Sequence, residues 1–239
     1  MLLPGLPLLA LAAIDVAVPR ASAQSAQAPV SAVSRIEIGE RVEFFTTAGK
    51  LSPDGRTWRL PIDGRVYLPT HSHVRKAVIA QALKTGFGVT PARADEMRFD
   101  ERVDQLLRAN KVGRQVAVSI AGRMLVLPPS DGDGHFIGTI DIPADDPALA
   151  TANGQVSFQA LLPPRHVQPF TGHVLLIAPK GRSIISDVDD TVKITNVLDR
   201  RRMLEATFVK PFEAVPGMSN LYQTWASEGA QVHFISSTP

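Results

Sequence analysis

Cysteine is absent from the 239-residue chain, which excludes disulfide bonds, thiol catalysis and cysteine metal sites. Aromatic residues make up only 6% of the sequence, and the formal net charge is a small +2. Because a charge so close to zero lacks the strongly basic balance typical of nucleic-acid binding, we expect no nucleic-acid partner. The remaining composition, 44% hydrophobic and 20% charged, is that of an ordinary globular protein.

Apolar runs of membrane-spanning length are also lacking. An apolar stretch from Leu2 to Ala13 precedes Ala21-Ser22-Ala23, a small-x-small cleavage signature. The stretch is too short for a permanent membrane span, so we predict a signal peptide over residues 1–23 and a secreted or periplasmic protein. Residues 24–34 are rich in Ala, Gln, Ser and Pro, which is a linker composition.

Short segments rich in Val, Ile, Phe and Thr recur over residues 35–179, and several alternate apolar with polar positions. Turn signals punctuate these segments, among them Pro53-Asp54-Gly55 and Asp63-Gly64. Many short strands separated by such turns are typical of a sandwich. We therefore predict a β-sandwich-like domain over residues 35–179.

Two helical stretches interrupt this β pattern, at residues 72–85 and 95–110. The second places four apolar side chains on one face of a helix, namely Phe99, Val103, Leu106 and Leu107. We expect both helices to pack on the sandwich or to form an insertion in it.

From residue 180 the pattern changes to strand, helix, strand. Ser183 to Ser186 is a short apolar run, residues 218–225 have apolar positions at helical spacing before Gly229, and residues 231–236 form a second apolar run. This βαβ pattern predicts two parallel strands joined by a right-handed crossover. Ligands of such sheets bind beyond the carboxyl ends of the strands.

Three carboxylates, Asp187, Asp189 and Asp190, directly follow the first of these strands. Like charges this close together repel one another, so either the turn is solvated or a cation and a phosphate bind there. Ser236 and Ser237 end the second strand at the same edge of the sheet. This coincidence favours a phosphoryl-transfer site.

Phosphoryl transfer to a carboxylate requires a nucleophile, an acid, a divalent cation and donors for the phosphoryl oxygens. Asp187 would attack phosphorus, and Asp189 would protonate the leaving oxygen and then activate water. Mg²⁺ prefers oxygen ligands and would hold Asp187 and the phosphate together. Ser236 or Ser237 would donate a hydrogen bond to a phosphoryl oxygen.

An apolar strand, Asp-x-Asp-x-Thr and a second strand ending in Ser together resemble the haloacid dehalogenase-like phosphohydrolases. Residues 184–239 resemble one branch more closely, the phosphatidate phosphatase catalytic domains related to the lipins. The motifs that carry this resemblance are the Asp-x-Asp-Asp-Thr core, Lys-Ile-Thr, Phe-x-x-x-Pro-Gly and Ser-Ser-x-Pro. The resemblance implies a Mg²⁺-dependent hydrolase that removes phosphate from phosphatidate or a related phospholipid at a membrane surface.

The resemblance also implies roles for individual residues. Asp187 is then the nucleophile and a metal ligand. Asp189 is the acid/base, and its backbone carbonyl contacts the metal as well. Thr191 supports the loop, and Ser236, with Ser237 beside it, binds phosphate.

One departure from the superfamily concerns its third-motif Lys and fourth-motif acidic pair, which later strands carry. The sequence here ends at Pro239, just past the second motif. We therefore expect an α+β two-part chain, with a β-sandwich-like domain followed by an incomplete, Rossmannoid α/β haloacid dehalogenase-like domain over residues 180–239. We expect this chain to be inactive by itself.

Two other functions remain open. The chain would be a non-catalytic lipid- or protein-binding sandwich protein if its phosphatase segment is a remnant, or a phosphatase for a soluble phosphomonoester. Arg200, Arg201 and Arg202 follow shortly after residues 188–197, which we call the acidic loop. They either steer an anionic head group or membrane surface toward the site or form a solvated helix face.

Overall fold

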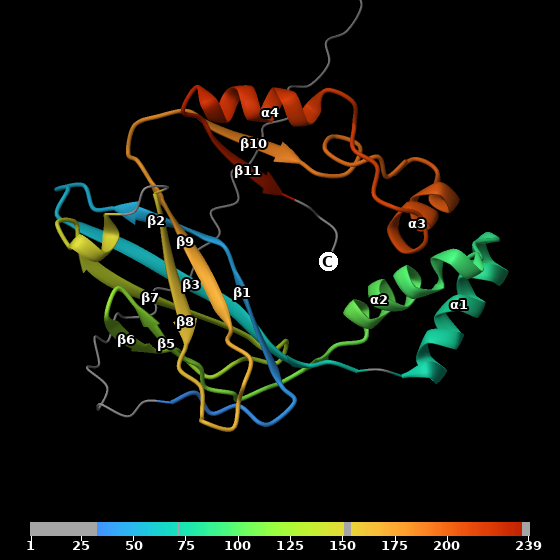
Figure 1. The fold of residues 1–239 in the computed structure, drawn as a ribbon, viewed down its shortest axis with the longest axis horizontal. Coiled ribbons are helices and arrows are strands. Elements are labelled where there is room, and N and C mark those ends of the chain that lie inside the picture. Colours follow the sequence, from blue (N-terminus) through green and yellow to red (C-terminus); the bar gives the residue numbers. More distant parts are fainter. Residues whose placement is uncertain (1–32, 71, 151–153, 236–239) are drawn as a thin grey trace, which may run out of the picture.

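The computed structural model describes residues 33–70, 72–150 and 154–235 (Figure 1). Their strands form a nine-stranded mixed sheet and a separate two-stranded sheet. The strands of the large sheet are β1 (Arg41–Phe45), β2 (Thr47–Leu51), β3 (Thr57–Leu68), β4 (Ala109–Asn110), β5 (Ala117–Ile120), β6 (Arg123–Val126), β7 (His135–Pro143), β8 (Gln155–Ala160) and β9 (Thr171–Ile177). The small sheet consists of β10 (Ser183–Asp187) and β11 (Gln231–Ile235).

The described helices differ in length and position. The four α-helices are α1 (His73–Phe87), α2 (Glu96–Leu106), α3 (Arg200–Phe208) and α4 (Met218–Ser227), and the two short 3₁₀ turns are η1 (Arg93–Asp95) and η2 (Pro147–Leu149). None of the helices in the described ranges has the length and hydropathy that a membrane crossing requires. The predicted signal peptide, residues 1–23, and nearly all of the predicted linker lie outside the described residues, so both stay predictions.

The large sheet is organised around β3, whose residues alternate between its two faces. One face buries Leu60, Ile62 and Val66 completely, as the two-residue period of a strand requires. β7 pairs with one edge of β3, and β1 and β2 share the other. β2 continues the sheet through a parallel pairing with β9, and β8, β5 and β6 follow in that order.

The core of this sheet shows that it folds over on itself. β7 pairs with β3, and β6 lies at the far end of the strand order. A Cβ atom at Gly138 of β7 would nevertheless lie 3.8 Å from Leu125 of β6, and a flat sheet could not bring these two residues together. The β-sandwich-like description of residues 35–179 remains a prediction.

The turn predicted at Asp63-Gly64 is wrong, because β3 continues without interruption through both residues. Gly64 lies between Phe44 of β1 and Phe136 of β7 in the strand register. A Cβ atom at Gly64 would lie 2.5 Å from the carbonyl oxygen of Glu43 and 2.8 Å from the Phe136 ring. The glycine therefore allows a close approach inside a strand, which is the other common use of glycine in a sheet.

Replacing Gly64 with alanine should lower the free energy of unfolding by about 1–3 kcal/mol, because a backbone carbonyl and a buried ring must move to admit the methyl group. Urea denaturation measures the change. Gly132→Ala is the matched control, because a Cβ there meets no atom within 4 Å, and its midpoint should not move. Equal midpoints for the two variants would contradict this explanation of Gly64.

Helices α1 and α2 form an insertion in the large sheet. The chain leaves β3 at Leu68 and re-enters at Ala109 of β4, which is the residue paired with Leu68. Ser72 caps the start of α1 through its side chain, and Gly88 ends the helix in the left-handed conformation, as in common helix caps.

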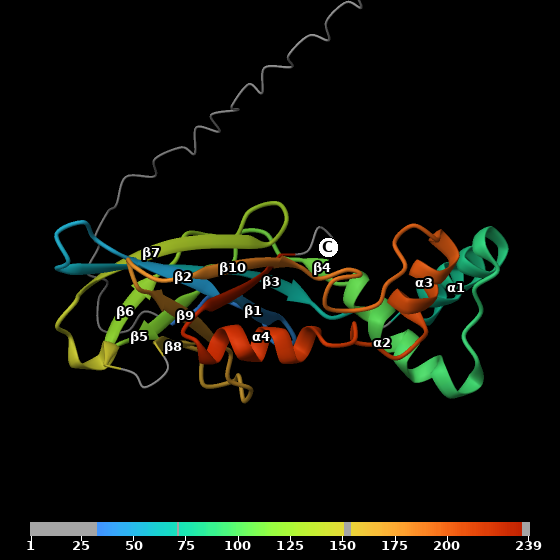
Figure 2. The same ribbon diagram turned by 90° about the horizontal axis from the view of Figure 1, so that it is seen from above.

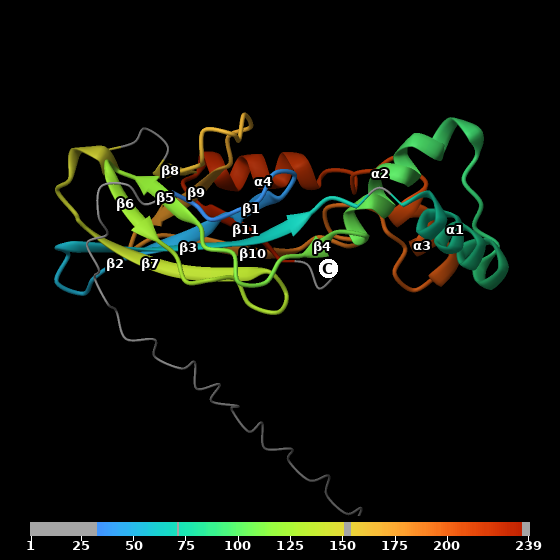
Figure 3. The same cartoon turned by 90° about the horizontal axis from the view of Figure 1, so that it is seen from below.

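The inserted helices pack mainly on α3. Their shared apolar cluster, which we call the three-helix cluster, consists of buried Leu83, Val89, Phe99, Val103 and Val209. Leu106, predicted on the buried face of α2, is instead 52% exposed, because α2 ends there and the chain turns back toward the sheet. Figures 2 and 3 show α1, α2 and α3 together at one end of the molecule. The three-helix cluster thus joins segments on both sides of residue 180.

The predicted strand, helix and strand at the carboxy-terminal end are confirmed as β10, α4 and β11. β10 and β11 are parallel and pair from Ser183 with Gln231 to Asp187 with Ile235. α4 lies along the pair (Figure 2), and Tyr222 from this helix contacts the Phe234 ring edge-on at 5.3 Å. The carboxyl ends of both strands point toward the end of the molecule that carries α3 (Figure 1).

Candidate functional site

β10 brings Asp187 to the carboxyl edge of the small sheet. Neighbouring residues of a strand point to opposite faces, so Ser186 is buried where Asp187 is exposed. The Ser186 hydroxyl lies 2.5 Å from the hydroxyl of Tyr222 in α4 and donates to the carbonyl oxygen of Asp187 at 2.9 Å. Contact with the helix therefore holds the strand end from which the Asp187 carboxylate extends into solvent.

A turn after β10 orients Asp189. The carbonyl oxygen of Val188 accepts the Lys193 amide at 3.0 Å, which brings the Lys193 ammonium to 3.2 Å from Asp189 Oδ1. The buried Thr195 hydroxyl donates to the same oxygen at 2.6 Å. The Asp189 side chain, only 14% exposed, is therefore held in one orientation two residues after Asp187.

Asp190 has a different environment from the other two carboxylates. It accepts three backbone hydrogen bonds, from the amides of Thr195 at 2.7 Å, Asn196 at 2.6 Å and Val197 at 2.7 Å. These bonds, that from Val197 first, hold the pKa of Asp190 below its ordinary value of 3.8, because they favour the charged form. Its φ of 59° lies in the left-handed region, which aspartate tolerates better than most residues. Asp190 is thus the anchor of the loop.

Acid should release this anchor. Because the folded-state pKa of Asp190 is lowered, its contribution to loop stability is present above the unfolded-state pKa and is lost as pH falls through the folded-state pKa. We expect the amide resonances of Thr195, Asn196 and Val197 to titrate together, with a midpoint below pH 3.8. An NMR titration measures this midpoint, and Asp190→Asn should remove the shared transition. A midpoint above the ordinary value would contradict the anchoring role.

Phe212 connects the acidic loop to the inserted helices. Its ring lies between two cations, with the Lys193 ammonium 4.9 Å and the Arg102 guanidinium 4.0 Å from the ring centroid. Both distances are within the range of cation–π attraction. Arg102 also donates hydrogen bonds to two carbonyl oxygens in the last turn of α3, where a cation is favoured. Burial lowers the pKa of this guanidinium from its ordinary value. Contacts therefore run without a break from α2 through Phe212 and Lys193 to Asp189.

The segment after α3 also pairs directly with the acidic loop. The Ile194 amide donates to the carbonyl oxygen of Glu213 at 2.8 Å, and the Val215 amide donates to that of Val192 at 2.9 Å. These backbone bonds hold Phe212 next to Lys193 and support the acidic loop at Val192 and Ile194.

Whether the site suits a metal ion depends on which oxygen atoms are available. Among the described residues, no group of three or more His, Asp or Glu side chains is arranged to hold a metal. The Asp190 carboxylate already accepts hydrogen bonds from backbone amides, and the Asp189 carboxylate contacts Lys193 and Thr195. The Asp187 side chain, in contrast, is exposed. Mg²⁺ usually keeps several waters and takes only one or two carboxylates. The exposed Asp187 carboxylate is suited to an ion bound in that way, and the contact of the Asp189 backbone carbonyl with the metal stays a prediction.

The remaining predicted site residues have different outcomes. Ser236 and Ser237, predicted to bind phosphate, lie outside the described residues, and the described part of β11 ends at Ile235 beside Asp187. Thr191 donates its amide to the Val188 carbonyl at 3.4 Å, and its predicted supporting role stays a prediction.

Sequence reasoning did not predict the contacts of Lys193, Thr195, Phe212 and Arg102. For the first two, the Lys-Ile-Thr segment after the acidic core was the available signal, because a tight turn brings residues four to six positions apart together. Arg102 had no local signal, since its contacts are made across the fold.

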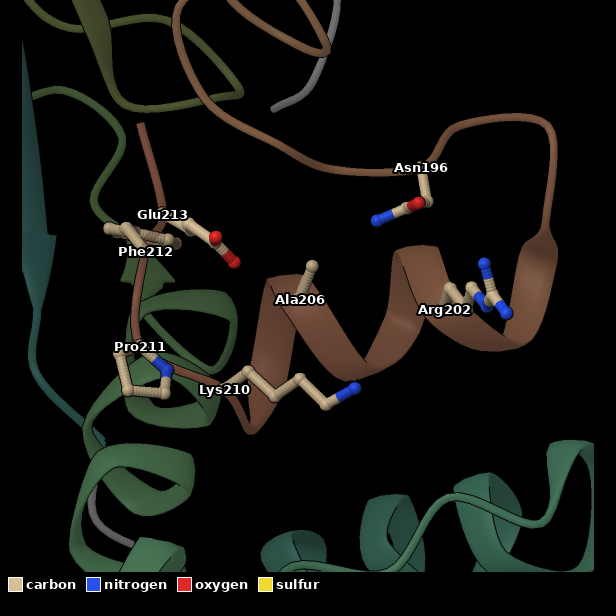
Figure 4. A pocket seen from close by; sticks show the side chains of 7 residues that line it. All are labelled: Asn196, Arg202, Ala206, Lys210, Pro211, Phe212 and Glu213. Carbon is tan, nitrogen blue, oxygen red and sulfur yellow. The ribbon is translucent and has the colours of Figure 1, made fainter. Parts of the chain in front are cut away.

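A cavity of about 620 Å³ adjoins the site. Figure 4 shows Arg202, Ala206 and Lys210 along one side, Asn196 above them, and Phe212 and Glu213 beyond the end of α3. Asn196 also donates its amide to Asp190, and Phe212 contacts Lys193. The cavity therefore shares residues with the acidic loop and has two cationic side chains in its lining.

Comparison with known proteins agrees with this geometry. Residues 182–239 match the family model of the phosphatidate phosphatase APP1 catalytic domain. The chain is also similar to an uncharacterized protein of Schizosaccharomyces pombe, with 31% identity over 115 residues. That alignment covers 45% of this chain and 18% of the yeast protein, so the chain spans a minor part of that relative. β10, the acidic loop, α3, α4 and β11 thus all lie in the segment that is similar to the phosphatidate phosphatase APP1 catalytic domain, residues 182–239.

Proposed function

We propose that this protein is a Mg²⁺-dependent phosphomonoester hydrolase that acts on phosphatidate. The observation that carries the proposal is the placement of Asp187. It is an exposed carboxylate at the carboxyl end of a parallel strand, with an oriented Asp189 two residues away, inside a segment that matches a phosphatidate phosphatase family. Ligand sites of α/β sheets occur at this edge.

In the proposed reaction an Asp187 carboxylate oxygen attacks phosphorus, and the bond from phosphorus to the diacylglycerol oxygen breaks. Asp189 gives its proton to that leaving oxygen. Asp189 then accepts a proton from the water that attacks the aspartyl-phosphate, which releases inorganic phosphate and restores Asp187. Asp189 must therefore begin the cycle protonated, and it recovers its proton in the second step. Between the two steps it is a carboxylate, which Lys193 at 3.2 Å can pair with.

The other parts of the site follow from the same arrangement. Bound Mg²⁺ would neutralise phosphoryl charge next to the Asp187 carboxylate. Thr195 and Lys193 are positioning residues in this proposal, because each contacts Asp189 and leaves Asp187 free to react. Ser236, with Ser237 beside it, would donate hydrogen bonds to phosphoryl oxygens.

The test is release of inorganic phosphate from dispersed phosphatidate, with Mg²⁺ and with a chelator, compared with release from a soluble phosphomonoester. Mg²⁺-dependent release from phosphatidate supports the proposal. Release from the soluble ester alone would mean that the substrate is a soluble phosphomonoester and not phosphatidate. Absence of release from both would agree with the inactivity expected of this chain by itself and would also fit a non-catalytic binding role, whereas release would show that the expected inactivity is wrong.

A further inference from the structure

An exposed surface beside the acidic loop has no role in the proposed chemistry. It consists of Val197, Leu198, Arg200, Arg201 and Arg202, and we call it the arginine–leucine surface. Leu198 is completely exposed, and Val197 is 47% exposed. The surface includes the first turn of α3, at the end of the molecule toward which the carboxyl ends of β10 and β11 point (Figure 1).

The three arginines keep their charges accessible. Arg201 pairs with Glu205 and Arg202 with Asp199, yet the two arginine side chains remain 64% and 67% exposed. Arg200 lies 4.9 Å above the Phe87 ring of α1. Cations in the first turn of a helix are disfavoured by the helix dipole, so these arginines do not stabilise α3 through that dipole. Their exposed charges are accessible to an anionic partner.

Hydrogen bonds connect the arginine–leucine surface to the acidic loop. Asp190 accepts the Val197 amide at 2.7 Å, and Asp199 caps α3 by accepting the Arg202 amide at 3.1 Å. Leu198 therefore projects from a segment anchored at both ends. A partner that contacts Leu198 would lie close to the loop that carries Asp189.

We propose that the arginine–leucine surface docks on an anionic phospholipid bilayer, with Val197 and Leu198 entering the headgroup–acyl boundary and the arginines contacting lipid phosphates. An exposed apolar tip flanked by cations has the chemistry of an interfacial membrane contact. Arg202 and Lys210 also line the adjoining cavity, where Glu213 and the ion pair of Lys210 with Glu205 at 2.6 Å offset part of their charge (Figure 4). The choice of phosphatidate as the anionic lipid depends on the proposed function.

Vesicle flotation tests this docking. The chain carries Asp187→Asn throughout, so that lipid turnover cannot alter the vesicles, and is mixed with phosphatidylcholine vesicles with or without phosphatidate. We expect flotation only with phosphatidate. Arg200→Gln with Arg201→Gln should weaken vesicle binding about five-fold per arginine, and Leu198→Asp should weaken it about ten-fold or more.

Matched controls come from exposed residues elsewhere in the chain. Val167 is 96% exposed, so Val167→Asp makes the same change at a distant tip, and Arg56→Gln removes an exposed arginine. Neither should change flotation. Absence of flotation by the parent chain, or equal losses for Leu198→Asp and Val167→Asp, would overturn the proposal.

A soluble phosphomonoester distinguishes this proposal from the proposed function. With Asp187 restored, Leu198→Asp should lower phosphate release from phosphatidate vesicles and leave release from the soluble ester unchanged. Equal losses on both substrates would contradict docking. If no variant hydrolyses either substrate while flotation follows the expected pattern, the proposed function fails and the membrane contact stands.

Discussion

Asp187→Asn should lower Mg²⁺-dependent phosphate release from phosphatidate at least about 10³-fold in a form of the protein that also supplies the third-motif Lys and the fourth-motif acidic pair. The amide cannot form the aspartyl-phosphate, whereas the similar size of the side chain leaves the exposed strand end undisturbed. Phosphate release measured at saturating Mg²⁺ gives the loss, and circular dichroism confirms that the fold is retained.

Asp190→Asn is the matched control for this result. It removes a neighbouring charge, and its amide oxygen can still accept the bonds that Thr195 and Asn196 donate to one carboxylate oxygen, whereas the bond from Val197 to the other oxygen is lost. We expect a much smaller loss of activity for this variant. Equal losses of activity in both variants would mean that the total charge of the loop determines activity. That result would contradict the assignment of Asp187 as the nucleophile.

Phe99→Ala should cost about 3–5 kcal/mol of stability in the three-helix cluster. Phe99 is only 4% exposed and packs in a small cluster separate from the core of the large sheet. We expect the helices to open while the sheet stays folded, so that hydrogen exchange accelerates in α1, α2 and α3 but not in β3.

The control for Phe99→Ala lies on the same helix. Leu106 is 52% exposed, and Leu106→Ala should change stability by less than about 0.5 kcal/mol. Since α2 supports the acidic loop through Arg102 and Phe212, Phe99→Ala should also increase exchange at the Thr195 amide. An unchanged Thr195 amide would mean that the loop holds its shape without the helices.

The position of Asp187 could be predicted because it depends on local patterns. An apolar run, a helical spacing and a second apolar run define two parallel strands, and parallel strands place their carboxyl ends at one edge. The same kind of reasoning misread Asp63-Gly64. A glycine inside a strand and a glycine in a turn look alike until the partner strands, here those of Glu43 and Phe136, are known.

The surroundings of Asp189 and Asp190 were less accessible to sequence reasoning. The sequence predicted either a solvated turn or a bound cation and phosphate for the three carboxylates. In the structure, backbone amides donate to Asp190, and Lys193 and Thr195 contact Asp189. Turn geometry decides these partners. The contact of Arg102 with α3 joins residues 105 positions apart, which no local pattern encodes, and Leu106 was misplaced because the end of α2 was predicted too late.

The long separation between α2 and α3 has a consequence for how the protein folds. Closing a loop of this size costs conformational entropy before any contact compensates for it, and non-local contacts of this kind slow folding. During synthesis, β1 through β9 can pair before α3 has emerged. Until then, Phe99 and Val103 of α2 lack the residues of α3 that pack against them in the three-helix cluster. The acidic loop therefore reaches its final shape late, and the helices of the insertion are the part of a newly made chain most exposed to aggregation.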